Sequence, residues 1–92
     1  MKLIYSAEAV NDLIRLRAFI AEKSPVAAAR IAMELVRRID ALKQFPEMGH
    51  AVSLAPEPSS IRDMLFGDYV VRYVPRDEVL IILRVWHHYE RR

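Results

Sequence analysis

The segment "VLIILRVW" at residues 79–86 restricts the possible folds of this 92-residue chain more than any other. Apart from one arginine it is apolar, which is typical of a strand inside a sheet that is covered on both faces. Polar or charged residues interrupt every longer apolar run, so the sequence predicts no membrane span. The strand therefore needs neighbouring strands and a covering layer from the rest of the chain.

A helix predicted over residues 7–23 supplies part of that layer. Ser6 is suited to be its N-cap, and Glu8 places a negative charge in the first turn, where it is favourable. Helical spacing arranges the apolar residues in two stripes: Ala9, Leu13, Leu16 and Ile20, and beside them Val10, Ile14, Ala18 and Ala21. The polar residues expected to lie away from both stripes are Asn11, Asp12, Arg15 and Glu22.

A second helix is predicted from Pro25 to about Gln44. Ser24 is suited to cap it, and proline in the first helical position loses no hydrogen bond. Its buried stripe comprises Ala28, Ile31, Leu35, Ile39 and Leu42, widened by Ala32 and Val36. Glu34 lies four residues from both Arg30 and Arg38, which favours ion pairs on the outer surface. The short connection predicts that the two helices form an antiparallel hairpin.

The last third of the chain is predicted to form β-structure. Candidate strands at 60–66, 69–74 and 79–86 are separated by "GD", a two-residue hairpin signal, and by "PRDE", in which Pro75 suits the second turn position. "KLIY" at 2–5 adds a short strand, and residues 45–60 are expected to be a structured irregular connection. The order β-α-α-β-β-β predicts an α+β fold with a helical hairpin on a mainly antiparallel sheet.

The composition limits the kind of protein further. Ninety-two residues suit a single domain, 1–92, and a hydrophobic content of 53% is high for this size, which favours some apolar surface reserved for a partner. The absence of cysteine excludes disulfides, thiolate zinc sites and cysteine nucleophiles. The N-terminus has no apolar segment typical of a signal peptide, so we expect a cytoplasmic protein.

Three arginines in the predicted strands suggest a binding surface. Alternation on the last strand predicts that Val79, Ile81, Leu83 and Val85 meet the helices, whereas Leu80, Ile82, Arg84 and Trp86 point the other way. Because bulges shift such alternation, it stays open whether Arg62, Arg72 and Arg84 share one face; if they do, that face is partly apolar and partly cationic. Such faces occur at protein interfaces and at phosphate sites. The alternative is that Arg72 and Arg84 pair with Asp63, Glu78 or a backbone carbonyl and only hold the sheet together.

The C-terminal "WHHYERR" contains the remaining candidate residues. Adjacent strand residues point to opposite faces, so His87 and His88 cannot readily chelate one metal ion, and we expect neither a metal nor a cofactor. His88 is a possible acid–base group, with Tyr89 beside it. The sequence has no phosphate-binding glycine loop, nucleophile elbow or HExxH motif, so no residue spacing requires an enzyme.

Several of these features, in this order, resemble the ParE/RelE toxin superfamily over about nine-tenths of the chain. The matching pieces are Tyr5-Ser6, Ser24-Pro25, "FPEMG" at 45–49, Arg62, "YVVRY" at 69–73 and "ILRVWH" at 82–87. The resemblance implies the toxin of a type II toxin–antitoxin pair, wrapped by the mostly helical C-terminal segment of a small cognate antitoxin. It also implies one of two targets: ParE-like members poison DNA gyrase, and RelE-like members cleave mRNA in the ribosomal A site.

The individual residues resemble the ParE-like branch more closely. The RelE-like pattern has a second basic residue where this chain has Met64, and an arginine where it has Val70. Arg84, Val85, Trp86 and His87 resemble the ParE-like ending, but the usual continuation is replaced by His88-Tyr89, an ending that some ribosome-dependent nucleases of the superfamily share.

The resemblance thus leaves two toxin hypotheses. In a gyrase poison, Arg62, Arg84, Trp86 and His87 would contact the target with help from Arg72. In a ribonuclease, the phosphate would be neutralised by Arg62 and Arg84, and the proton would move through His88 or Tyr89. A third possibility is a non-toxic relative kept as an interaction module. Because basic and acidic residues nearly balance, at a net charge of +2, we expect contact with DNA only indirectly, through the antitoxin.

Overall fold

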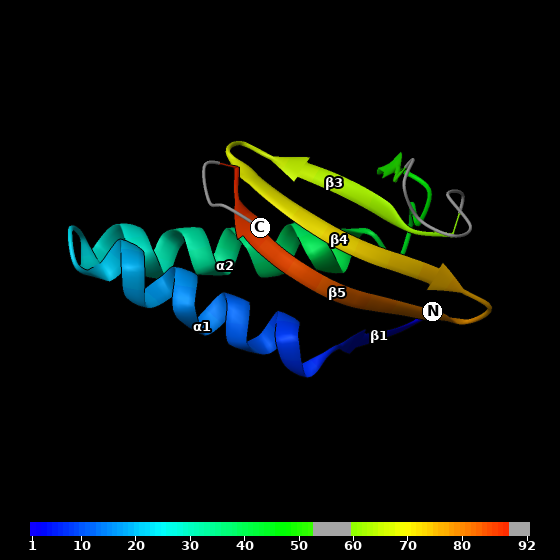
Figure 1. The fold of residues 1–92 in the computed structure, drawn as a ribbon, viewed down its shortest axis with the longest axis horizontal. Helices are drawn as coiled ribbons and strands as arrows, with labels where there is room; N and C mark the ends of the chain where they lie inside the picture. The colour runs from blue at the N-terminus through cyan, green and yellow to red at the C-terminus, as the bar shows by residue number, and fades with distance from the viewer. Residues whose placement is uncertain (53–59, 89–92) are drawn as a thin grey trace.

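The computed structural model describes residues 1–52 and 60–88, and it places a pair of helices against one face of a five-stranded sheet (Figure 1). The sheet has the strand order β1-β5-β4-β3-β2, in which only β1 and β5 run parallel. The elements in chain order are β1 (Lys2–Tyr5), α1 (Ala7–Ala21), α2 (Pro25–Ala41), β2 (His50–Ala51), β3 (Arg62–Phe66), β4 (Tyr69–Arg76) and β5 (Val79–His87). The predicted α+β fold is confirmed, and the irregular connection contains the additional short strand β2.

Both helices begin where the sequence predicts and end earlier. The Oγ atom of Ser6 accepts a hydrogen bond from Ala9 N–H at 3.0 Å, and that of Ser24 accepts one from Ala27 N–H at 3.1 Å. After Ala21 and Ala41 the chain continues in turns: Lys23 N–H donates to Ile20 O, and the N–H groups of residues 42, 43 and 44 each donate to the carbonyl three residues earlier. The predicted ends at residues 23 and 44 therefore included these turns.

Only one of the two apolar stripes predicted for α1 is buried. Ala9 and Leu16 are in the core, whereas Val10 and Ile14 are 43% and 64% exposed. The position between Ala9 and Leu16 on the buried stripe is occupied by Asp12, which is 4% exposed. The prediction that Asp12 faces outward was therefore wrong, because the covered face of α1 is the one that contains residues 9, 12 and 16, and Val10 and Ile14 lie outside it.

The helix α2 follows its prediction more closely. Ala28, Leu35, Ile39 and Leu42 are buried, but Val36 is 48% exposed and does not widen the stripe inward. On the outer surface Glu34 pairs with Arg38 as expected, and Arg37 is its second partner. The helical layer thus contributes one apolar face to the core and leaves further apolar side chains on its outside.

A β-bulge in β5 changes which residues meet the helices. Tyr73 pairs with Ile82 and Arg72 with Arg84, so Leu83 is an extra residue on β5. Leu80 and Ile82 are fully buried before the bulge, and Val85 is fully buried after it. The prediction was therefore wrong for Val79, Ile81 and Leu83 and right for Val85, since one inserted residue reverses the alternation. The sequence left the presence of a bulge undecided, and the structure contains one.

The two hairpin turns differ from each other. Gly67 and Asp68 connect β3 to β4 as predicted, and Gly67 adopts a φ of 54° that favours glycine. The second turn is formed by Asp77, with a φ of 55°, and Glu78, whereas Pro75 lies within β4 opposite Leu80. The predicted turn position of Pro75 was wrong. Because β3 begins opposite Tyr73, it does not reach Pro75, and such an edge position tolerates a residue without an N–H.

Candidate functional site

The strand register decides which side chains share the sheet face that points away from the helices. Asp63, Arg72 and Arg84 form one row across β3, β4 and β5, and Leu65, Val70 and Trp86 form the next. Residues that alternate with them in the core are Met64, Val71 and Val85. We call the surface formed by the two rows the open face, and it comprises Asp63, Leu65, Val70, Arg72, Arg84 and Trp86.

Arg72 is held in the middle of the open face by a carboxylate and an aromatic ring. Its Nε donates to Asp63 Oδ1 at 2.9 Å and its Nη2 to Asp63 Oδ2 at 3.0 Å, a bidentate pair. Its guanidinium also lies 5.0 Å from the centre of the Trp86 ring. Hydrogen bonding to Asp63 raises the pKa of Arg72 above its ordinary value. The three side chains therefore form a rigid, charge-paired platform.

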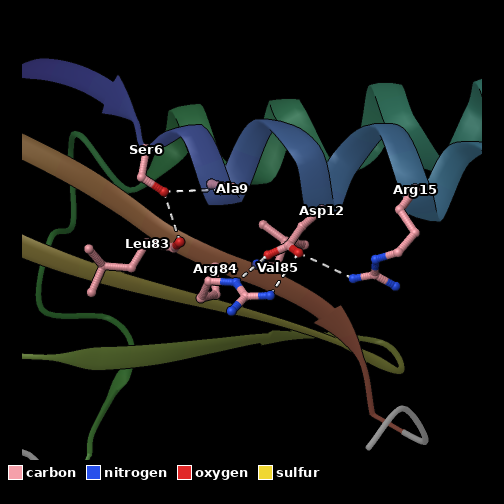
Figure 2. Close-up of polar contacts among 7 residues, drawn as sticks. All are labelled: Ser6, Ala9, Asp12, Arg15, Leu83, Arg84 and Val85. Carbon is pink, nitrogen blue, oxygen red and sulfur yellow. Dashed lines mark hydrogen bonds and ion pairs between the residues drawn. The ribbon is translucent and has the colours of Figure 1, made fainter. Parts of the chain in front are cut away.

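Arg84 makes a second bidentate pair, with Asp12 on α1 (Figure 2). The Nε–Oδ2 and Nη2–Oδ1 distances are 2.8 and 3.0 Å, and Asp12 Oδ2 also accepts a hydrogen bond from Val85 N–H at 2.9 Å. Arg15 donates to Asp12 Oδ1 at 3.3 Å. Burial by itself would raise the pKa of Asp12, but the hydrogen bonds from Arg84, Val85 and Arg15 outweigh it and lower the pKa below 3.8.

The position of Asp12 follows from the unequal lengths of two neighbouring strands. β1 ends at Tyr5, and β5 continues to His87, so the last residues of β5 extend past their partner strand. Side chains from the start of α1 supply the missing partners: Ser6 Oγ donates to Leu83 O at 2.9 Å, and Asp12 accepts from Val85 N–H. The exposed edge of the sheet is thereby closed by a helix.

Arg62 lies on the other face of the sheet from Arg72 and Arg84. It is the cross-strand neighbour of Tyr73, which is fully buried beneath the helices. Its Nε donates to Gly49 O at 2.9 Å and its Nη2 to Glu47 O at 3.0 Å, while Gly49 N–H donates to Tyr73 Oη at 2.9 Å. Of the three arginines, whose common face the sequence left open, Arg62 therefore lies apart from Arg72 and Arg84 and holds the connection after α2.

The histidines of the C-terminal segment lie apart from the open face. His87 meets the ring of Tyr69 edge to face, with 5.1 Å between the ring centres, on the side of the sheet opposite Trp86. His88 is exposed, and its N–H donates to Asp68 O. Tyr89 lies outside the residues that the structure describes. Within residues 1–52 and 60–88, no three histidine or acidic side chains gather as a metal site requires.

The geometry can be compared with known proteins. A family model described as the ParE toxin of the type II toxin–antitoxin system parDE matches residues 3–92. The chain belongs to the ParE toxin family. The superfamily resemblance predicted from the sequence is thereby confirmed, and this ParE-family protein is a toxin of the type II toxin–antitoxin class.

Two curated relatives of this ParE-family toxin come from Caulobacter vibrioides. Toxin RelE2 is 30% identical over 87 residues, which cover 94% of this chain and 93% of the relative. Toxin RelE1 is 33% identical over 92 residues, which cover 98% and 96%. Relatives carrying the RelE name and a family model carrying the ParE name do not distinguish gyrase from the ribosome as the target.

Two solved structures share the fold of this ParE-family toxin. The chromosomal ParDE system from P. aeruginosa matches with a TM-score of 0.77 and 19% identity over 95% of both chains. The conserved hypothetical protein HP0894 from Helicobacter pylori matches with a TM-score of 0.61 and 21% identity over 98% of this chain and 97% of its own. In the described part of the toxin, no helix is long and apolar enough to cross a membrane.

Asp12 is the site residue that the sequence reasoning missed. The available signal was its position, because residues 9, 12 and 16 recur at the spacing of one buried helical face. An acidic residue at such a position needs a donor, and its partner proves to be Arg84, for which the sequence suggested Asp63, Glu78 or a backbone carbonyl instead. The sequence predicted the end of β1 at Tyr5 but not its pairing with β5, which leaves Val85 N–H beyond the end of β1 and in need of an acceptor.

Proposed function

We propose that this ParE-family toxin acts by binding DNA gyrase through its open face and that it is not a ribonuclease. The observation that carries the proposal is the pairing of its arginines: Arg72 with Asp63, Arg84 with Asp12, and Arg62 with backbone carbonyls. A phosphate-cleaving site needs cations directed at the scissile phosphate, where charge develops. Arg72 and Arg84, whose charges are already balanced by carboxylates, and Arg62, whose donors are occupied by backbone carbonyls, are better suited to a preorganised structure than to a phosphate site.

The apolar part of the open face supports the same proposal. Leu65 is 61% exposed, and the half-buried Trp86 lies two strands away in the same row. Tryptophan and arginine side chains contribute most of the energy in many protein interfaces. We therefore propose Trp86, Arg72 and Leu65 as the residues that contact the target, with Arg84 supporting them. If His87 also contacts gyrase, the interface must extend around the end of β5 to the sheet face opposite Trp86.

We further propose that a cognate antitoxin covers apolar side chains on the helical layer. Large apolar residues are exposed on both helices, among them Val10, Ile14, Val26 and Met33. Such surface is uncommon on a protein that functions alone, and an amphipathic helix is the usual element to cover it. The fold shared with a solved structure that is titled as a ParDE toxin–antitoxin system supports this partner.

The decisive experiment is a supercoiling and DNA-cleavage assay with purified gyrase, ATP and increasing amounts of the toxin without antitoxin. Accumulation of cleaved DNA with loss of supercoiling is the expected result. Trp86→Ala should weaken the effect, whereas Phe19→Ala, which truncates an aromatic residue that is 60% exposed on α1, should not. Normally supercoiled, intact DNA in the presence of the folded wild-type toxin would refute gyrase as the target.

Ribosome-dependent mRNA cleavage is the second candidate function. It is supported by the RelE names of the two curated relatives and by the exposed His88 in a His-Tyr ending. The variant His88→Ala with Tyr89→Phe separates the candidates. If the toxin is a nuclease, growth inhibition and mRNA cleavage on translating ribosomes should both be lost. If the toxin binds gyrase, growth inhibition should persist in this variant. A wild-type chain that inhibits neither gyrase nor translation would be the non-toxic interaction module.

A further inference from the structure

One carboxylate connects the helical layer to the last strand of the sheet. Asp12 is 4% exposed and receives hydrogen bonds from the side chain of Arg84 and from the backbone N–H of Val85, the next residue along β5. Figure 2 shows the Arg84 guanidinium and the Val85 backbone meeting the same carboxylate below α1. Asp12 therefore restrains both a side chain and the backbone at consecutive positions of one strand.

The restrained residues lie directly beside the aromatic residue of the open face. Trp86 follows Val85, and its ring lies under the guanidinium of Arg72, which is in turn the cross-strand neighbour of Arg84. On the β1 side, β5 has no strand at these positions because β1 ends at Tyr5. The orientation of Trp86 thus depends on β4 from one side and on Asp12 from the other.

We propose that Asp12 is a positioning residue for target binding, which acts through Arg84 and Val85 to hold Trp86 under Arg72. The inference rests on the proposed function, in which the open face contacts gyrase, and it assigns a role to a residue on α1 that is not itself part of that face. It also assigns Arg84 a supporting role instead of a direct contact.

The cost of burying a carboxylate favours positioning over stabilisation as the reason for this pair. The site lies on an otherwise apolar stripe between Ala9 and Leu16, where an apolar residue would be the simpler solution. Removing a carboxylate from water opposes much of the attraction between the charges, so a buried ion pair often adds little stability over a well-packed apolar residue. Its geometric specificity is what an apolar residue lacks, because a bidentate pair fixes direction as well as distance.

The first test uses Asp12→Asn, with Ser24→Ala as its control. Asparagine retains the size of the side chain and one acceptor for Val85 N–H, but it loses the ion pair with Arg84. Ser24→Ala removes the N-cap of α2, whose Oγ accepts a hydrogen bond from Ala27 in its own helix. It therefore lowers stability at a distance from the open face. Trp86 is the single tryptophan of the chain, so its fluorescence reports on the open face without any partner.

In the folded Asp12→Asn toxin we expect the acrylamide quenching constant of Trp86 to rise by about twofold and the toxin concentration for half-maximal gyrase inhibition to rise by about tenfold. Ser24→Ala should leave both quantities near the wild-type values. Wild-type quenching and wild-type inhibition by folded Asp12→Asn would overturn the proposal, and so would equal changes in Ser24→Ala.

A second variant keeps the test informative if Asp12→Asn does not fold. Arg84→Lys retains the positive charge and leaves the Asp12–Val85 hydrogen bond in place, but it loses the two-pronged geometry. It should raise the quenching of Trp86 and weaken gyrase inhibition in the same direction, and unchanged values would overturn the proposal. If wild-type toxin leaves gyrase unaffected, the proposed target fails, and the quenching of Trp86 in the variants decides the positioning role independently.

Discussion

The removal of Asp12 should lower the free energy of unfolding through two separable contributions. Asp12→Ala leaves Val85 N–H buried without an acceptor, at a cost of about 2 kcal/mol, and deprives Arg84 of its ion pair. Because the Arg84 side chain is 40% exposed, water replaces part of that pair, and its loss costs about 1 kcal/mol. Asp12→Asn keeps an acceptor for Val85 N–H, so it should cost only about 1 kcal/mol.

These free energies correspond to measurable differences in thermal stability. For a chain of 92 residues, about 3 kcal/mol lowers the melting temperature by about 15 °C, and about 1 kcal/mol lowers it by about 5 °C. Urea denaturation followed by far-ultraviolet circular dichroism measures both variants against wild type, at equal denaturant slopes. Equal losses of stability in Asp12→Ala and Asp12→Asn would refute the reasoning, because only the alanine variant removes the acceptor for Val85 N–H.

The pH dependence of stability provides a further check on the same carboxylate. The pKa of Asp12 is lowered in the folded protein, so the unfolded chain binds the proton more tightly and acidification favours unfolding. The contribution of the charged carboxylate is complete well above pH 3.8 and is lost as the pH falls through the lowered native pKa. The stability difference between wild type and Asp12→Asn should therefore shrink on acidification. A difference that stays constant from neutral pH to pH ~2 would contradict the assigned shift.

Four variants at other positions test residues outside this carboxylate site. Gly49→Ala should lower the free energy of unfolding by about 2 kcal/mol in urea titrations, because its Cβ would lie 2.7 Å from Asp63 O. Gly67→Ala should cost only about 1 kcal/mol, since it meets a positive φ but no atom within 4 Å; a larger loss than for Gly49→Ala would contradict this order. Tyr73→Phe should cost about 1–2 kcal/mol by leaving Gly49 N–H unpaired, and unchanged stability would show another acceptor. Ile14→Gln should change stability by less than about 0.5 kcal/mol. In calorimetry it should bind the proposed antitoxin about tenfold more weakly than wild type, and equal affinity would place the antitoxin elsewhere.

Local patterns in the sequence determined the elements and their order. The N-caps Ser6 and Ser24 specify where both helices begin, because a hydroxyl satisfies an N–H that has no partner within the helix. The Gly67-Asp68 turn specifies the β3–β4 hairpin, because glycine tolerates a positive φ. The same patterns, with the motifs between them, identified the superfamily that the comparison with known families confirmed.

The tertiary structure alone decided how those elements present their side chains. The single extra residue at Leu83 reverses the alternation of β5, and the sequence predicted the strand correctly while assigning residues 79–83 to the wrong face. Arg62 points to the helical side because its register places it opposite the buried Tyr73. The Gly67-Asp68 turn fixes this register, but the packing of distant segments decides which of the two faces the helices cover.

The burial of Asp12 is the clearest case in which a local sequence pattern does not predict the position of a side chain. Helical spacing put this residue on a face, but its role as partner of Arg84 and Val85 arises because β1 ends at Tyr5 while β5 continues to His87. The unpaired edge that results belongs to no single segment. The sequence determined which groups were available, and the arrangement of β1, β5 and α1 in space decided which of them needed one another, because a buried N–H or charge must find its partner wherever the fold places it.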